Sequence, residues 1–129
     1  MTSDRYMKGL REFKKHFGKA AVAYLQPLEE IYPKFAQVNM EFPFGDLYAD
    51  HKSLDARTRE LVALAALTVL GTLPQMNAHI KAALRCGATE TEILEVITQM
   101  TAYCGFPLAT NALLEAGKAF KEFDDMPKK

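Results

Sequence analysis

The amino-acid sequence predicts an all-α protein, a bundle of about six helices in which residues 1–129 form a single domain. Apolar residues recur at spacings of three and four over most of the chain, which is the period of an amphipathic helix. No run of alternating β-branched residues lies between turn signals, so no sheet is expected. The length is that of one domain, and a chain of this size can bury a core without metal ions or disulfides.

The N-terminal helices of residues 1–50 are divided first at Gly18. Residues 4–17 carry basic side chains beside one apolar stripe, which predicts an amphipathic helix; the stripe consists of Tyr6, Leu10, Phe13 and Phe17. A second helical segment spans residues 19–41. Pro27 suits the first turn of a helix, whereas Pro33 is expected to kink or divide the segment.

Residues 42–53 are predicted to form an ordered loop, because they hold the strongest turn signals of the chain. Their apolar content is too high for a solvated linker. We therefore expect the loop to lie on the core or on a partner subunit through Phe42, Phe44, Leu47 and Tyr48.

The next predicted helix spans residues 57–70, with Asp55 as its N-cap and Gly71 at its end. Apolar residues surround most of its circumference, so we expect it to be the buried central helix. A helix with Pro74 in its first turn should follow, from residue 72 to about residue 85.

Two more helices are expected in the C-terminal third. Thr89 and Glu92 have the spacing of a capping box, and the helix that they open should end near residues 104–105. Pro107 should open the last helix, which we expect to run to about Phe120, with residues 124–129 as a frayed tail.

Composition and charge exclude several functions. Sixteen Lys and Arg balance sixteen Asp and Glu, and a chain of zero formal charge is a poor candidate for binding nucleic acid. The apolar stretch of residues 61–67 is too short to span a membrane, and no signal-peptide pattern opens the chain. Cys86 and Cys104 match no metal-site spacing. We expect a cytoplasmic protein without a metal ion.

His79 is the first candidate for chemistry. The turn at residues 71–73 is short, so the helices on either side should lie antiparallel, which places His79 opposite Ala65 and one turn from Glu60. An imidazole beside a partly buried carboxylate is a usual acid/base pair. A core histidine that bonds a nearby carbonyl is the alternative, and spacing alone leaves both open.

The other polar candidates have simpler explanations. His16 lies in a basic stretch and should be solvated, and His51 lies at the polar end of the predicted loop. Arg57 and Arg59 are either surface charges or groups that bind a carboxylate. Both cysteines are expected to be small buried thiols, although the spacing leaves open an exchange pair between them.

Two stretches of the sequence resemble the carboxymuconolactone decarboxylase family. The first begins with Arg59-Glu60-Leu61-Val62-Ala63-Leu64-Ala65-Ala66-Leu67-Thr68 and continues with Gly71, Gln75, His79-Ile80, Ala83-Leu84 and Gly87. The second is Thr98-Gln99-Met100-Thr101-Ala102-Tyr103-Cys104-Gly105-Phe106-Pro107, followed by Asn111-Ala112-Leu113. The resemblance covers a family core of residues 54–120. It implies an all-helical bundle that assembles into dimers, trimers or hexamers.

The same superfamily contains thiol peroxidases of the alkylhydroperoxidase-D type, whose motif is a Glu, a CxxC pair and a His. Glu60 and His79 match that motif, but the cysteine positions fall on Thr72 and Gln75. Such a peroxidase needs an attacking and a resolving thiol, so this mechanism is not expected here.

The resemblance implies a carboxy-lyase of aromatic-compound degradation that decarboxylates a small lactone or related carboxylate without a metal or organic cofactor. His79 would donate a proton and Glu60 would orient it. Substrate contacts would come from Arg57, Arg59, Gln75, Tyr103 and Asn111. The expected assembly is a homo-oligomer, a hexamer or trimer, without nucleic-acid or membrane partners. An antioxidant protein acting through Cys104, or a non-catalytic oligomer, are the alternatives.

Overall fold

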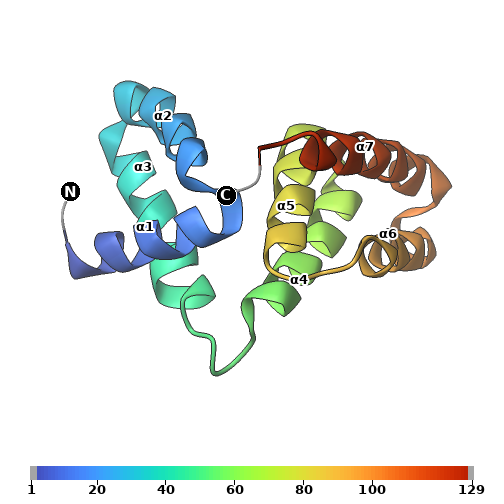
Figure 1. The fold of residues 1–129 in the computed structure, drawn as a ribbon, viewed down its shortest axis with the longest axis horizontal. Coiled ribbons are helices and arrows are strands. Elements are labelled where there is room, and N and C mark those ends of the chain that lie inside the picture. Colours follow the sequence, from blue (N-terminus) through green and yellow to red (C-terminus); the bar gives the residue numbers. More distant parts are fainter. Residues whose placement is uncertain (1–2, 128–129) are drawn as a thin grey trace. The chain divides into compact units, whose positions relative to one another are not determined.

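The computed structural model describes residues 3–127, which contain seven α-helices, one 3-10 segment and one π-helix, and no strand (Figure 1). The all-α prediction is confirmed. The chain divides into two compact units, residues 1–56 and residues 57–129.

The N-terminal unit opens with α1 (Asp4–Phe17), which matches the predicted helix. The side chain of Ser3 caps it by accepting a hydrogen bond from the backbone N–H of Tyr6, and Gly18 ends it at a φ of 83°. The 3-10 segment η1 (Lys19–Tyr24) follows directly.

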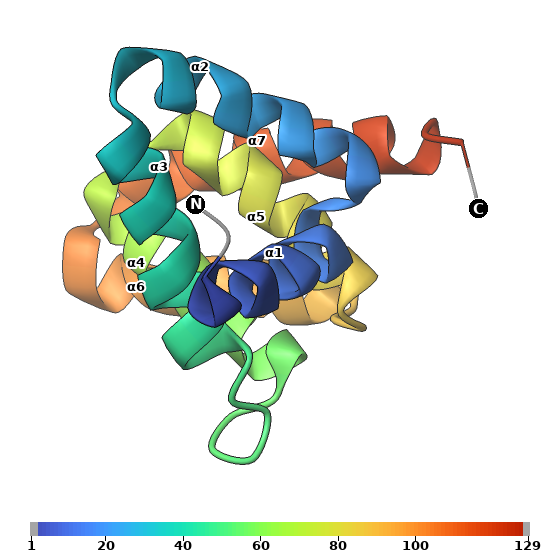
Figure 2. The ribbon, with the colours of Figure 1, turned by 90° about the vertical axis from the view of Figure 1, so that its left-hand side faces the viewer.

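Pro33 divides the next segment, as the sequence predicts. The helix α2 (Leu25–Ile31) ends at Tyr32, whose backbone is extended, and α3 (Pro33–Asn39) begins with the proline in its first turn. Figure 2 shows α2 and α3 as two separate helices. One predicted helical segment is therefore two α-helices behind a 3-10 turn. This division raises the number of helices above the six expected.

The loop predicted for residues 42–53 is wrong in its first half. Residues Met40–Tyr48 form a π-helix, η2, that continues from α3 despite Pro43 and Gly45. The physical reason is packing: the buried ring of Phe44 meets the rings of Phe13 and Phe17 of α1 edge to face, with centroids 5.1 and 5.8 Å apart. Only residues 49–55 connect η2 to the next helix.

Packing of α1 against η2 builds the N-terminal core, whose buried residues are Phe13, Ala21, Leu25, Met40 and Phe44. Tyr6, Leu10 and Phe17 pack against it, so the apolar stripe predicted for α1 does face the core.

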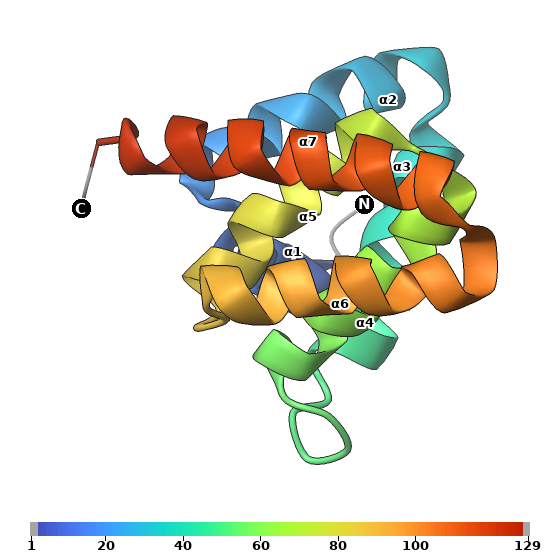
Figure 3. The ribbon, with the colours of Figure 1, turned by 90° about the vertical axis from the view of Figure 1, so that its right-hand side faces the viewer.

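Four helices form the C-terminal unit: α4 (Ala56–Leu70), α5 (Leu73–Arg85), α6 (Glu90–Cys104) and α7 (Phe106–Asp124). Both α5 and α6 pack on α7, and Figure 3 shows α6 and α7 side by side. The capping box predicted for Thr89 and Glu92 is present. The last helix extends to Asp124, beyond the predicted end, and residues 128–129 of the predicted tail lie outside the described residues.

The C-terminal core lies between these four helices. It consists of Leu64, Met76, Ile80, Ala83, Ala88, Ile93, Ile97, Ala109, Ala112, Ala116, Ala119 and Phe120. The prediction that residues 57–70 are buried all round is wrong for this chain. Only Glu60, Leu64 and Thr68 of α4 are buried, at spacings of four residues that place them on one helix face, whereas Val62 and Leu70 are exposed.

Candidate active site

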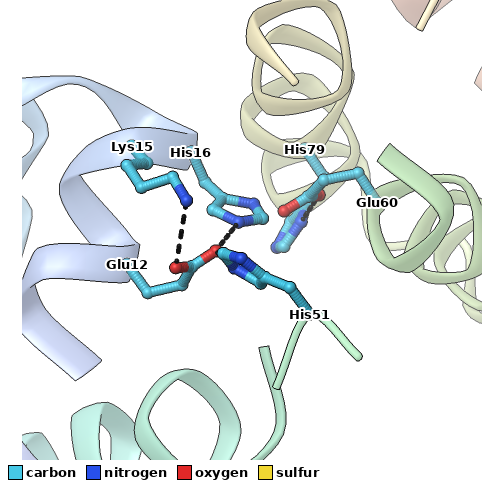
Figure 4. Close-up of polar contacts among 6 residues, drawn as sticks. All are labelled: Glu12, Lys15, His16, His51, Glu60 and His79. Carbon is cyan, nitrogen blue, oxygen red and sulfur yellow. Dashed lines mark hydrogen bonds and ion pairs between the residues drawn. The ribbon is translucent and has the colours of Figure 1, made fainter. Parts of the chain in front are cut away.

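Glu60 of α4 and His79 of α5 meet as the antiparallel pairing predicts. Nδ1 of His79 lies 2.7 Å from Oε1 of Glu60, although the residues are 19 positions apart in the sequence (Figure 4). The Glu60 side chain is fully buried and that of His79 is 13% exposed. A carboxylate without access to water therefore shares a hydrogen bond with an imidazole that keeps a small opening to solvent.

The contact with Glu60 occupies one of the two ring nitrogens of His79, Nδ1. With Glu60 ionised, the carboxylate only accepts hydrogen bonds, and the proton of the shared bond lies on Nδ1 of His79. In that state a proton transfer by this ring would use Nε2, and Glu60 would stabilise the ring with both nitrogens protonated. The pair has the composition and the geometry of an acid/base dyad.

Apolar packing holds the two helices together beside this pair. Leu64, Met76 and Ile80 are fully buried. Thr68 of α4 donates a hydrogen bond to the carbonyl oxygen of Leu64 and lies 3.8 Å from the sulfur of Met76 in α5. These contacts keep α4 and α5 in register, which a hydrogen bond between their side chains requires.

Arg57 has a partner within the protein. Its Nε lies 3.3 Å from Oε1 of Glu92, and its Nη2 forms an ion pair with the other oxygen of that carboxylate. The hydrogen bond from Arg57, together with that from the backbone of Thr89, lowers the pKa of Glu92 below its ordinary value. Arg57 thus joins the first turn of α4 to the capping box of α6. Arg59 lies beside Glu60 in sequence and is half-buried.

The remaining predicted substrate contacts come from three different helices, α5, α6 and α7. Gln75 is exposed on α5 one turn before His79, so the two share a helix face. Tyr103 lines an apolar groove of about 600 Å³ with Ala65, Ala66, Val69, Leu70, Gln99 and Met100, a set that contains neither Glu60 nor His79. Asn111 is exposed on α7 and makes no side-chain hydrogen bond to another residue of 3–127.

A second histidine cluster, in the N-terminal unit, was missed by the sequence reasoning. His16 is fully buried rather than solvated, and its Nε2 lies 2.7 Å from Oε2 of Glu12. His51 points its Nε2 at the same oxygen, 2.9 Å away (Figure 4). The spacing of Glu12 and His16, four residues on one helix face next to Phe13, is the signal that could have revealed the pair.

Glu12 is ionised in this setting. Burial by itself would raise the pKa of its carboxyl, since the side chain is only 5% exposed. The hydrogen bonds from His51 and His16, with the charges of His16 and Lys15, outweigh that effect and hold the pKa of Glu12 below its ordinary value.

Both cysteines are half-buried free thiols, and Sγ of Cys104 lies 3.2 Å from the carbonyl oxygen of Met100. Within residues 3–127, no three His, Cys, Asp or Glu side chains come together in an arrangement that could hold a metal ion. Nor does any helix in that range combine the length and the apolar composition needed to cross a membrane.

Comparison with known proteins places the chain in a family. The model of the carboxymuconolactone decarboxylase family matches residues 33–118, and so begins earlier than the family core predicted from residue 54. An uncharacterized 15.0 kDa protein of Paracoccus denitrificans is 35% identical over 103 residues, which are 78% of this chain and 76% of that protein.

Two similar proteins have decarboxylase names. A 4-carboxymuconolactone decarboxylase of Acinetobacter baylyi is 29% identical over 126 residues, covering 97% of this chain and 93% of that enzyme. A nitrosuccinic acid decarboxylase of Metarhizium robertsii is 26% identical over 85 residues, covering 66% of this chain and 59% of the enzyme. With its all-helical fold and with most of its length matched, this chain belongs to the carboxymuconolactone decarboxylase family.

Proposed function

We propose that this protein decarboxylates a small lactone or a related carboxylate, with His79 as proton donor and Glu60 as its partner. The observation that carries the proposal is the 2.7 Å contact between the two side chains, in a chain whose similar proteins include two named decarboxylases. A buried carboxylate that orients an imidazole is the part that an acid-catalysed decarboxylation needs.

The chemistry needs little else from the protein. When CO2 leaves a lactone carboxylate, the electron pair of the broken carbon–carbon bond conjugates with the lactone carbonyl, so the substrate is its own electron sink. The protonated His79 then gives the proton on Nε2 to that carbon, and a proton from water restores the ring. The balance is one carboxylate and one proton consumed, with CO2 and one carbon–hydrogen bond formed. This scheme uses no cofactor.

A cation must hold any carboxylate that the substrate retains. Arg57 and Arg59 in the first turn of α4 are the candidates, and Arg57 also forms an ion pair with Glu92. We assign the substrate carboxylate to these two guanidinium groups, with Gln75 as a further polar contact on the face of His79. Tyr103 and Asn111 are assigned no contact with the substrate.

We also propose that the protein is a cytoplasmic homo-oligomer, a trimer or hexamer. The C-terminal unit exposes large apolar side chains: Val69 and Leu70 line the groove of Tyr103, and Val62 and Phe106 are exposed as well. A second copy that packs there would remove this surface from water. Sedimentation should give a particle several times the chain mass of 14.4 kDa, and a monomer at micromolar concentration would refute the assembly.

The test of activity uses the purified protein with 4-carboxymuconolactone and, separately, with nitrosuccinate, and measures CO2 release. The expected result is turnover of at least one compound by the wild type, a loss in His79→Asn, and no change in Glu95→Gln, an exposed site on α6. If the wild type turns over neither compound, the proposal is overturned and a non-catalytic oligomer is favoured.

A further inference from the structure

We propose that Glu12, His16 and His51 form a second acid–base site, at which Nδ1 of His51 exchanges a proton with a small carboxylate that has an acidic carbon–hydrogen bond. The site lies wholly within the N-terminal unit and uses none of the residues assigned to decarboxylation. Its parts come from α1 and from the segment after η2.

The hydrogen bonds determine where the protons are. Both imidazoles direct Nε2 at one oxygen of an ionised carboxylate, which can only accept, so both rings carry a proton on Nε2. In the neutral ring of His51 the other nitrogen, Nδ1, therefore has a lone pair. Among residues 3–127, Nδ1 of His51 has no hydrogen-bond partner, so that lone pair is available as a base.

Burial separates the roles of the two histidines. His16 is fully buried and its ring contacts Phe44 and Tyr48, so it has no access to a ligand. The side chain of His51 is 44% exposed. His16 thus acts as a positioning residue that holds the Glu12 carboxylate through a buried hydrogen bond. His51 is the exposed residue, and its Nδ1 is the reactive atom.

The charges around His51 favour an anionic ligand. Lys15 of α1 places its Nζ 3.5 Å from Oε1 of Glu12 and is itself exposed. Asp50, the acidic neighbour of His51 in sequence, accepts hydrogen bonds from the backbone N–H of Lys52 and from the hydroxyl of Ser53. The exposed cation of Lys15 therefore faces solvent, while the negative charge of Glu12 is buried.

The proton-transfer step balances without any other reactant. Nδ1 of His51 takes a proton from the carbon next to a carbonyl, the electron pair of that carbon–hydrogen bond moves into the carbonyl as an enolate, and Glu12 stabilises the imidazolium that forms. The reverse step returns a proton to the same carbon. In heavy water this cycle replaces hydrogen by deuterium on the ligand.

The test measures deuterium exchange at the carbon next to the carbonyl of 2-oxobutanoate by proton NMR. The wild type should accelerate exchange, and His51→Gln, which keeps an N–H donor for Glu12 but has no basic atom, should lose about 10²-fold or more of that acceleration. Lys52→Gln is the matched control in the same segment and should behave as wild type. No acceleration by the wild type, or equal acceleration by His51→Gln, would overturn the proposal.

A second measurement does not depend on turnover. Nitrogen NMR of labelled histidine should show neutral His51 as the Nε2-protonated tautomer in the wild type and a mixture of tautomers in Glu12→Gln. A mixture in the folded wild type would overturn the positioning role of Glu12. The tautomer of His51 is measured without any substrate, so this result is separate from that of the decarboxylation assay.

Discussion

Gly9 of α1 lies in backbone contact with Met40, the first residue of η2: a Cβ atom added to Gly9 would lie 2.1 Å from the carbonyl oxygen of Met40. Gly45 makes the reciprocal approach, since its Cβ would lie 2.6 Å from the carbonyl oxygen of Arg5. The two glycines let a regular helix and a π-helix pack without side chains between them. This close approach supports the part of α1 that carries Glu12 and His16.

We expect Gly9→Ala to destabilise the N-terminal unit, because the added methyl cannot avoid the backbone of Met40. Overpacking of this kind typically costs about 1–3 kcal/mol, and here the obstacle is backbone rather than a flexible side chain. Urea unfolding measures the cost. Gly117→Ala in α7 is the matched control, because a Cβ there meets nothing within 4 Å. The better helix propensity of alanine should raise the free energy of unfolding by about 0.5–1 kcal/mol. Equal effects of the two variants would contradict the steric explanation.

Replacing His79 should separate catalysis from packing. If it is the proton donor, His79→Asn lowers decarboxylation by about 10²–10⁴-fold, the range of general acid catalysis, while helicity and assembly stay as in the wild type. A core histidine behaves differently, with a lower melting temperature and unchanged activity per folded molecule. Activity and melting temperature measured on one preparation distinguish the two.

Glu60→Gln should reduce the rate less than loss of His79 does. A glutamine amide can still accept the hydrogen bond from Nδ1 of His79, but it has no negative charge with which to stabilise the protonated ring. Rates of Glu60→Gln and His79→Asn measured with the same substrate check the order. A rate of Glu60→Gln equal to that of the wild type would assign Glu60 to packing alone.

Glu12 should make stability depend on acid pH. Its pKa in the folded chain lies below the ordinary value of 4.5, so ionisation favours folding. The contribution is complete above pH 4.5 and is lost as the pH falls through the lower pKa of the folded state. Melting temperatures of the wild type and Glu12→Gln should therefore differ at pH 7 and converge below pH 4.5. If the two melting temperatures differ by the same amount at pH 7 and below pH 4.5, the charge of the Glu12 carboxylate is not the cause of the difference.

The capping box of α6 should have a measurable effect on stability. Thr89 accepts a hydrogen bond from the backbone N–H of Glu92, and Glu92 accepts one from the backbone N–H of Thr89. Thr89→Ala should cost about 1 kcal/mol of unfolding free energy, whereas Thr91→Ala, an exposed site two residues later, should cost about half that or less. Thermal or urea unfolding of both variants checks the difference.

Sequence reasoning worked best where one residue decides a local structure. Pro33 removes a backbone donor and Thr89 supplies a cap, so the division of α2 from α3 and the start of α6 follow from chemistry next to the residue. The contact of Glu60 with His79 was predictable for a related reason. A short turn between two helices constrains which residues face each other, and the register can be counted from the turn.

Where tertiary packing decides, local signals were misleading. Pro43 and Gly45 favour a turn, but residues 40–48 are helical. Packing of the Phe44 ring on α1 stabilises this helix more than the local preference for a turn destabilises it. His16 sits among basic residues, yet its helix face is the one that η2 covers. The cluster with His51 depends on residues 39 positions apart in the sequence, which no periodicity could bring together.

The two cores have a consequence for how the chain opens. Among residues 3–127, the N-terminal core has five buried apolar residues and the C-terminal core has twelve, and no residue belongs to both. A segment of 56 residues is near the size at which a folded chain is only marginally stable alone. Amide hydrogens of α1 should therefore exchange through a partial opening of lower free energy than those of α5 and α7. Thermal unfolding would then take place in two steps, and the first would release the buried charge of Glu12 to water before the pair of Glu60 and His79 is broken.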